Sequence, residues 1–435
     1  MNNIEQDKNL QQVEGLQAEK EMVKPEFLND PERINKIDEL LNRGVEEIYP
    51  TYEEFRNELL SGKRLTVYMG IDPTAPELHV GHMSQLRKME RFQNLGHHVV
   101  LLIGDFTARI GDPTDKKASR QRLTNEQVTA NATTYIEQAS KIINFSKEST
   151  NPVEIRYNSE WLSKLDFEGV LELAANFTVQ QMLERSMFQK RIAEQKPINL
   201  IEFLYPLMQG YDSVALKTDV ELGGSDQIFN MLLGRELSNR ININKFVIAG
   251  KLLVDPSGKK IGKTEGNMVT LVDKPATMYQ KVMLWGDQIT PHALELCSKL
   301  PMEQVQEIEK KMNNGELSGL DAKKILAKTI VEELYSKEEA QEAAKIFEAL
   351  RTQNVEEQNI QVFDYNKNLN TNTTFVDILL ESKLAKSKSE ARRLIEQGGV
   401  TIDGVKITSN FDMVNFCGNI VKVGKSNYRK INLTD

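Results

Sequence analysis

Two histidines three residues apart, His79 and His82, are the clearest candidates for chemistry in this sequence. They follow an apolar, β-prone segment at residues 65–71, and a helical pattern begins near Leu78. Residues three apart share one face of a helix, and unpaired backbone N–H groups at a helix N-terminus favour a phosphate. Gly81 leaves room for a flat ligand such as a purine. The pattern predicts a nucleotide site, although a turn with two surface histidines has the same spacing.

Two later segments add positive charge that could hold the phosphates of a nucleotide. The first is a polar loop at residues 110–120, after an apolar run typical of a strand buried on both faces. The second, at residues 259–264, is a short basic loop suited to closing over a polyphosphate. The charged residues are Asp112, Lys116, Lys117 and Arg120 in the first loop and Lys260 and Lys263 in the second. A carboxylate beside cations can hold an amine as well as phosphates, although such loops are more often simply solvated.

A pocket wall is predicted between these two loops. Tyr205, Gln209 and Asp212 fall on one side of a predicted helix, at spacings of four and three. Each buried polar group without a partner costs about 1–3 kcal/mol, so this polar set implies partners or a ligand. Residues 220–227 then repeat the order of strand, glycine-rich turn and helix, and Asp226 could accept ribose hydroxyls. Core packing for Tyr205 and helix capping for Asp226 stay open as alternatives.

The elements that must position these residues form a parallel sheet. The segments 65–71 and 98–105 are predicted strands, joined by a helix that Gly96 ends, and this βαβ unit implies a right-handed crossover. The fold class is therefore α/β. The other expected elements are two helices within 25–63, helices at 126–144 and 167–191 around a β-prone stretch at 153–157, and a strand at 246–254. The region from 126 to 191 is interpreted as an insertion that splits the nucleotide fold and carries subunit contacts.

The composition limits the class of protein. The chain has 435 residues, enough for two or three domains, and no apolar run near the ~18 residues of a membrane helix. Its polar N-terminus resembles no secretory signal, and its two cysteines are too few for a disulfide framework, so we expect a cytoplasmic protein. The net charge is −8, but residues 374–435 hold ten Lys and Arg against seven Asp and Glu. A local RNA-binding face is therefore expected in the C-terminal part.

In this order, the motifs resemble the class I aminoacyl-tRNA synthetases, and specifically the bacterial tyrosyl-tRNA synthetases. Residues 79–82 look like the HIGH motif with Val in place of Ile, and residues 260–264 look like the KMSKS loop. The segments 70–74, 111–113, 205–212 and 223–227 match the family pattern as well. Glu221 stands where the better-known bacterial form has Gln, a change that looks like the second bacterial branch.

The resemblance implies a domain order. A Rossmann-type nucleotide-binding domain is followed by an α-helical domain near the anticodon and a small α+β S4-like RNA-binding domain. The expected boundaries are 1–24 for a polar extension without a role, 25–272 for the catalytic domain with a helical insertion at about 113–200, 273–351 for the helical domain, 352–373 for a linker and 374–435 for the S4-like domain.

The resemblance also implies residue roles. Tyrosine is activated by ATP, accompanied by Mg²⁺ on the phosphates, and the tyrosyl group is then transferred to tRNA. Phosphate and ribose contacts are assigned to Thr74, His79 and His82, and pyrophosphate contacts to Lys116, Arg120, Lys260 and Lys263. The tyrosine ammonium is assigned to Asp112, Tyr205 and Gln209, the phenol hydroxyl to Tyr68 and Asp212, and the adenosine side to Gly70, Gly81, Gly224, Asp226 and Gln227. RNA contacts are assigned to Lys386, Lys388, Arg392 and Arg393.

Expected partners are L-tyrosine, ATP, tRNA(Tyr) and a second copy of the chain, without a membrane or a protein-bound metal. Two rivals remain. A tryptophanyl-tRNA synthetase shares the fold and the phosphate motifs, but Tyr68 and Asp212 suit a phenol better. A non-catalytic RNA-binding paralogue would not need His79, His82, Lys260 and Lys263, which are all present.

Overall fold

The computed structural model describes residues 28–112, 123–255, 260–261, 268–352, 362–366, 373–403, 405–410, 420–424 and 427–434. Its described residues fall into two compact units. The first comprises those within 28–78 and 84–252, and the second those within 79–83 and 253–434. The predicted polar extension at residues 1–24 lies outside the described residues.

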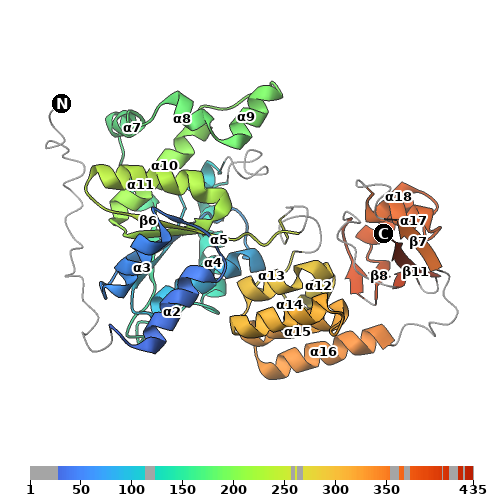
Figure 1. The fold of residues 1–435 in the computed structure, drawn as a ribbon. Coiled ribbons are helices and arrows are strands. Elements are labelled where there is room, and N and C mark those ends of the chain that lie inside the picture. Colours follow the sequence, from blue (N-terminus) through green and yellow to red (C-terminus); the bar gives the residue numbers. More distant parts are fainter. Residues whose placement is uncertain are drawn as a thin grey trace. The chain divides into compact units, whose positions relative to one another are not determined.

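The first unit contains a mostly parallel six-stranded sheet, which confirms the predicted α/β class (Figure 1). Its order is β1-β6-β5-β2-β3-β4, and only β1 is antiparallel to its neighbour. The strands are β1 (Val45–Tyr49), β2 (Thr66–Ile71), β3 (His98–Ile103), β4 (Glu154–Tyr157), β5 (Val220–Gly224) and β6 (Phe246–Gly250). From β2 the chain adds β3 and β4 on one side, and it returns to add β5 and β6 on the other. The strand order therefore reverses between β2 and β5, which is where open parallel sheets bind ligands.

Two strands were missed or misplaced by the sequence analysis. The two helices predicted before the first parallel strand are present as α2 (Pro31–Asn42) and α3 (Tyr52–Leu60), but β1 lies between them. Its exposed Glu46 and Glu47 gave no apolar alternation, as is common at a sheet edge. The β-prone stretch inside the predicted insertion is β4, which pairs in parallel with β3 and belongs to the sheet itself.

The remainder of the predicted insertion is helical but broken. After α5 (Asn125–Ala139) and the short α6 (Ser159–Leu162), the chain forms α7 (Phe167–Ala174), α8 (Val179–Leu183) and α9 (Ser186–Ala193). The first of these, α7, ends at Ala174, and Thr178 starts α8, because its side chain accepts a hydrogen bond from the Gln181 N–H and caps that helix.

Helices cover both faces of the sheet (Figure 1). On one face α3 packs against the sheet, with the rings of Phe55 and Phe246 centred 4.7 Å apart, and Phe92 of α4 (Val80–Asn94) follows at 6.3 Å from Phe55. The other face lies under α10 (Ile201–Leu216) and α11 (Ile228–Arg240), where Met231 packs against Val247. Because both faces are covered, the central strands are continuous apolar runs.

His97, just before β3, makes the first unit sensitive to acid. Its side chain is buried, and Nδ1 accepts a hydrogen bond from the Leu65 N–H at 3.2 Å. Burial, helped by Arg33 and Arg64, lowers its pKa to about 4, against about 6.5 in an unfolded chain. Between these values the unfolded chain binds the proton and the folded chain does not, so the free energy of unfolding falls as the pH falls.

We therefore expect His97→Gln, which keeps an acceptor but cannot titrate, to flatten this dependence. From pH 7 to pH 5 the wild type should lose about 2 kcal/mol more of unfolding free energy than the variant does. Urea unfolding followed by tryptophan fluorescence at the two pH values measures the difference. An equal loss in both proteins would contradict the assignment.

The second unit contains the predicted helical region. Its helices are α12 (Pro275–Met283), α13 (Thr290–Cys297), α14 (Met302–Asn313), α15 (Gly319–Leu334) and α16 (Lys337–Thr352). Their apolar faces meet in a core that includes Leu326 and Ile330, both fully buried. None of the helices in the described part of the chain combines the length and apolar composition that a membrane crossing requires.

The C-terminal module has two helices, α17 (Phe375–Glu381) and α18 (Lys388–Glu396), and a five-stranded sheet. The sheet has the order β7-β11-β10-β8-β9, formed by Val362–Asn366, Asn427–Thr434, Ile420–Val423, Val400–Ile402 and Val405–Ile407. β7 lies within the predicted linker, so residues 362–366 are an edge strand of this module, paired in parallel with β11. The polar composition of the surrounding residues concealed it. Ser387 caps α18, because its side chain accepts a hydrogen bond from the Glu390 N–H.

Candidate functional site

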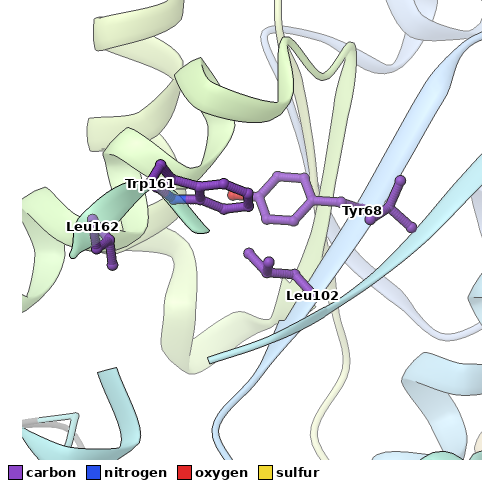
Figure 2. Packing of buried hydrophobic residues seen from close by; sticks show 5 residues of the cluster. Tyr68, Leu102, Trp161 and Leu162 are labelled. Carbon is purple, nitrogen blue, oxygen red and sulfur yellow. The ribbon is translucent and has the colours of Figure 1, made fainter. Parts of the chain in front are cut away.

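The site begins with Tyr68 in the middle of β2. The side chain is buried and packs with Leu102 and Trp161, as Figure 2 shows. Its hydroxyl lies 2.7 Å from Ser213 Oγ on α10. Burial is the main reason that the pKa of Tyr68 lies well above its usual value, and the nearby carboxylates of Glu221 and Asp212 add to the shift. The hydroxyl therefore stays protonated and can serve as donor or acceptor.

The polar face of α10 lies over this tyrosine. Tyr205, Gln209 and Asp212 come together on the helix as their spacing predicts, and each makes a hydrogen bond with another element. The Tyr205 hydroxyl donates to Asp72 Oδ2 at 2.8 Å, and Gln209 Nε2 donates to Glu221 Oε1 at 3.0 Å. The set is therefore a wall of partnered polar groups within the first unit.

Asp212 is held by two donors from the segment after β4. Trp161 Nε1 donates to its Oδ1 at 2.7 Å, and Asn158 Nδ2 donates to its Oδ2 at 3.3 Å. Burial raises the pKa of Asp212 well above its usual value, and these two donors oppose that shift. The family resemblance predicts that Tyr68 and Asp212 hold one phenol hydroxyl together. In the structure the Tyr68 hydroxyl contacts Ser213, and Asp212 accepts hydrogen bonds from Trp161 and Asn158. Different neighbours therefore fix the positions of the two side chains.

Asp72 is a further carboxylate of the site that the sequence analysis gave no role. It follows β2 directly, at the reversal of strand order, and accepts hydrogen bonds from Thr107 Oγ1 at 2.7 Å and from Tyr205. Burial raises its pKa to about 7, and the two hydrogen bonds reduce the shift. Gly104 must lack a side chain because a Cβ there would lie 1.9 Å from Asp72 Oδ1.

Asp112 and Gln227 belong to one hydrogen-bonded chain. Gln227 Nε2 donates to Asp112 Oδ2 at 2.7 Å, and Asn230 Nδ2 donates at 2.9 Å both to Gln227 Oε1 and to Gln209 Oε1. Gln227 was predicted on the adenosine side, apart from Asp112 and Gln209. In the structure Gln227 bonds Asp112 directly and is joined to Gln209 through Asn230.

The remaining predicted adenosine contacts lie at the carboxyl ends of β2 and β5. Gly70 is exposed at the end of β2, and Gly224 ends β5. A Cβ at Gly224 would lie 2.6 Å from Asp226 Oδ1 and 2.7 Å from Leu252 Cδ2, so a larger residue here would displace these two side chains. Thr74 is exposed in the turn after β2.

The two histidines stack at the start of α4. Their ring centroids are 3.9 Å apart with planes 25° from parallel, and His79 directly precedes the helix. The His79 N–H donates to His82 Nδ1 at 3.2 Å, and the Gly81 N–H donates to His79 Nδ1 at 3.1 Å. Each neutral ring therefore carries its proton on Nε2, where it can donate to an anion. A Cβ at Gly81 would lie 2.8 Å from His79 Cε1, so this glycine makes room for the histidine ring as well as for any ligand.

The predicted pyrophosphate cations are described only in part. Lys260 is exposed and lies opposite Val254 in an antiparallel bridge. Lys116, Arg120 and Lys263 lie outside the described residues. In the C-terminal module, all four predicted RNA-contact residues are exposed, namely Lys386, Lys388, Arg392 and Arg393. Lys388 also pairs with Asp377 at 2.6 Å.

Known proteins resemble both parts of the chain. The family of class I tRNA synthetases (W and Y) matches residues 60–351, and the S4 domain family matches residues 375–416. The tyrosine–tRNA ligase of Dehalococcoides mccartyi (strain CBDB1) is 41% identical over 399 residues, which cover 91% of this chain and 98% of that protein. The chain belongs to the tyrosine–tRNA ligase family.

Other members of this family support the placement. Tyrosine–tRNA ligase 2 of Vibrio cholerae is 40% identical over 90% of this chain and 97% of its own length. A truncated mitochondrial tyrosyl-tRNA synthetase of Coccidioides posadasii shares the fold, with a TM-score of 0.58 and 25% identity over 72% of this chain and 91% of its own. The family resemblance expected from the sequence is confirmed.

Several residues that hydrogen-bond the predicted site residues, directly or through another side chain, were not singled out from the sequence. They are Asp72, Asn158, Trp161, Ser213 and Lys245, and Lys245 is also the ion-pair partner of Glu221. Asp72 and Ser213 had a signal, since Asp72 lies inside the matched segment 70–74 and Ser213 directly follows Asp212. Asn158, Trp161 and Lys245 had none, because strand pairing alone brings them to the site.

Proposed function

We infer that the protein has tyrosine–tRNA ligase activity. The observation that carries this conclusion is the 41% identity across 98% of a tyrosine–tRNA ligase. In the first step, a carboxylate oxygen of L-tyrosine attacks the α-phosphorus of ATP, which forms tyrosyl-adenylate and releases pyrophosphate. In the second step, a ribose hydroxyl at the 3′ end of tRNA(Tyr) takes the tyrosyl group and AMP leaves.

We propose that the buried polar face of the first unit binds tyrosine. Asp212 and Tyr68 hold the phenol hydroxyl, while Asp112, Tyr205 and Gln209 receive the ammonium group. The support is chemical, because a buried carboxylate and a protonated hydroxyl match a phenol and offer nothing to a hydrocarbon ring. An indole could use only one of them. The tryptophanyl rival is therefore less favoured.

We propose that His79, His82 and Thr74 contact the ATP phosphates, with Gly70, Gly81, Gly224, Asp226 and Gln227 around the adenosine. The Nε2–H group of each neutral histidine can donate a hydrogen bond to a phosphate oxygen, so the rings need not take up a second proton. Lys116, Arg120, Lys260 and Lys263 hold the departing pyrophosphate. Mg²⁺ enters with ATP and is held mainly by phosphate oxygens. Positioning and charge stabilisation then supply the rate, since a carboxylate is already a nucleophile.

Exchange of pyrophosphate into ATP, measured with tyrosine, phenylalanine and tryptophan, tests the activation step. Exchange with tyrosine alone, followed by charging of tRNA(Tyr), is the expected result. Exchange driven by tryptophan would move the protein to the sister activity. RNA binding without exchange would favour a non-catalytic paralogue.

We also propose that the chain works as a homodimer in the cytoplasm and that exposed residues of its C-terminal module contact tRNA. The domain boundaries predicted from the sequence are proposed with one change, since β7 adds residues 362–366 of the predicted linker to the C-terminal module. Charge supports the RNA contact, since Lys386, Lys388, Arg392 and Arg393 lie close together in the chain and are exposed.

The dimer contact is assigned to α7, α8 and α9, where large apolar side chains are exposed. They are Phe167 and Leu171 on α7, Val179 on α8 and Ile192 on α9, with exposures from 47% to 78%, and Leu200, just before α10, adds a further one at 77%. Such a cluster on one region marks an interaction surface, whereas single exposed apolar residues do not. We expect Leu171→Asp to convert a dimer into a monomer in sedimentation equilibrium. Ile346→Asp, an exposed apolar position on α16, is the matched control and should leave the dimer intact. A monomeric wild type would contradict the proposal.

A further inference from the structure

Lys245 is a fully buried cation next to Ser213 and Tyr68 of the proposed tyrosine site. It precedes β6 and has no exposed surface. Its Nζ forms an ion pair with Glu221 and donates to Ser213 Oγ at 2.5 Å and to the Met231 carbonyl oxygen at 3.4 Å. An ammonium group has three N–H donors, so these contacts use all of them.

Stability alone is a weak reason for such a pair. Removing two charges from water costs several kcal/mol per ion, and replacing a buried ion pair with apolar residues is often neutral or stabilising. Glu221 is only 2% exposed, so both partners bear this cost. The pair is better explained by the side chains that Lys245 and Glu221 each contact.

Both ends hold residues of the tyrosine site. Glu221 is the register partner of Tyr68 on the neighbouring parallel strand, so the two side chains project to the same face of the sheet. Lys245 Nζ contacts Ser213, whose hydroxyl lies 2.7 Å from the Tyr68 hydroxyl, and Nζ itself lies 5.8 Å from the Tyr68 ring centre. At the other end, Glu221 accepts from Gln209.

The charges also determine hydrogen-bond direction. A carboxylate only accepts, so Gln209 must turn Nε2 toward Glu221, which leaves its Oε1 to accept from Asn230. An ammonium only donates, so Ser213 must accept from Lys245 and keeps one lone pair and one proton for its other neighbours. A neutral Gln at position 221 could face Gln209 with either end of its amide and would leave the direction undetermined.

We propose that Lys245 and Glu221 are a positioning pair that acts through Ser213 and Gln209 to fix the Tyr68 hydroxyl and the Gln209 amide, and so contributes to selection of tyrosine over phenylalanine. The proposal rests on the inferred tyrosine–tRNA ligase activity. Neither residue of the pair needs to touch the substrate.

The test compares kcat/KM for tyrosine and for phenylalanine in pyrophosphate exchange, using the full-length chain. Lys245→Met, Glu221→Gln and Ser213→Ala should each lower the ratio of the two values at least fivefold, mainly through a higher KM for tyrosine. The KM for ATP should stay within twofold of that of the wild type. Lys88→Met is the matched control, because Lys88 is another buried lysine of the first unit, which donates to the Leu40 and Arg43 carbonyl oxygens. It should lower the thermal midpoint without changing the ratio.

A single charge left in the core can unfold the chain, so the double variant Glu221→Gln with Lys245→Met is decisive. We expect it to recover the thermal midpoint of the wild type while its tyrosine-to-phenylalanine ratio stays low. A stable double variant with the ratio of the wild type would overturn the positioning role. Failure of the wild type to exchange with tyrosine at all would instead overturn the ligase activity, so the two failures can be told apart.

Discussion

Asp212→Ala should lower kcat/KM for tyrosine in pyrophosphate exchange about 10- to 100-fold and leave the value for phenylalanine nearly unchanged. The expected size follows from the 1.5–3 kcal/mol that a hydrogen bond to a charged group contributes. In the structure the carboxylate is buried and is fixed by Trp161 and Asn158, so no other group can take its place without repacking. Phenylalanine has no hydroxyl and loses nothing when the carboxylate is removed.

The control for this variant is another buried carboxylate of the same unit. Asp219 directly precedes β5 and accepts a hydrogen bond from the Thr66 N–H at 2.8 Å, at the opposite end of β2 from Asp72. Asp219→Ala should reduce stability and leave the tyrosine-to-phenylalanine ratio as it is. If Asp212→Ala lowered both amino acids equally, the phenol would have to be bound elsewhere.

His82→Asn should lower kcat for the activation step by about 100-fold with little change in the KM for ATP. A preorganised donor to charge that develops in the transition state is worth about this much, and its loss appears in kcat when ground-state binding is the same. Asparagine is chosen because its side-chain oxygen can still accept from the His79 N–H, as His82 Nδ1 does now. The variant therefore removes the Nε2–H donor while it keeps the start of α4.

His292→Asn is the matched control, since this histidine lies in α13 of the same unit and 3.9 Å from Glu295. It should exchange pyrophosphate at the rate of the wild type. A rise in the KM for ATP with unchanged kcat in His82→Asn would mean that the histidine binds ATP equally in the ground and transition states, which would contradict the assigned role.

These predictions depend on how the sheet is wound. The reversal of strand order between β2 and β5 brings Asp72 and the turn at Gly224 to one end of the sheet. Helix α10 adds Tyr205 and Gln209, which bond Asp72 after β2 and Glu221 on β5. A substitution on either side of the strand-order reversal therefore alters the same site.

The sequence by itself determined the features that depend on local spacing. The placement of Tyr205, Gln209 and Asp212 on one helix face and the end of α4 just before Gly96 follow from periodicity and capping, because these act within a few residues. The order of the motifs also determined the family, since each motif alone is weak and their sequence is specific.

Tertiary structure decided which groups support those residues. Tyr68 and Ser213 are 145 positions apart, and Lys245 reaches Glu221 across 24, so no local pattern pairs them. The short strands β1 and β7 depend on partners far away in the chain and were not recognised from the sequence. The β4 segment was recognised as β-prone, but only its pairing with β3 places it in the sheet. Strand pairing and buried hydrogen bonds are satisfied by whichever residue the fold brings near, and for that reason the supporting network of the site could be found only in three dimensions.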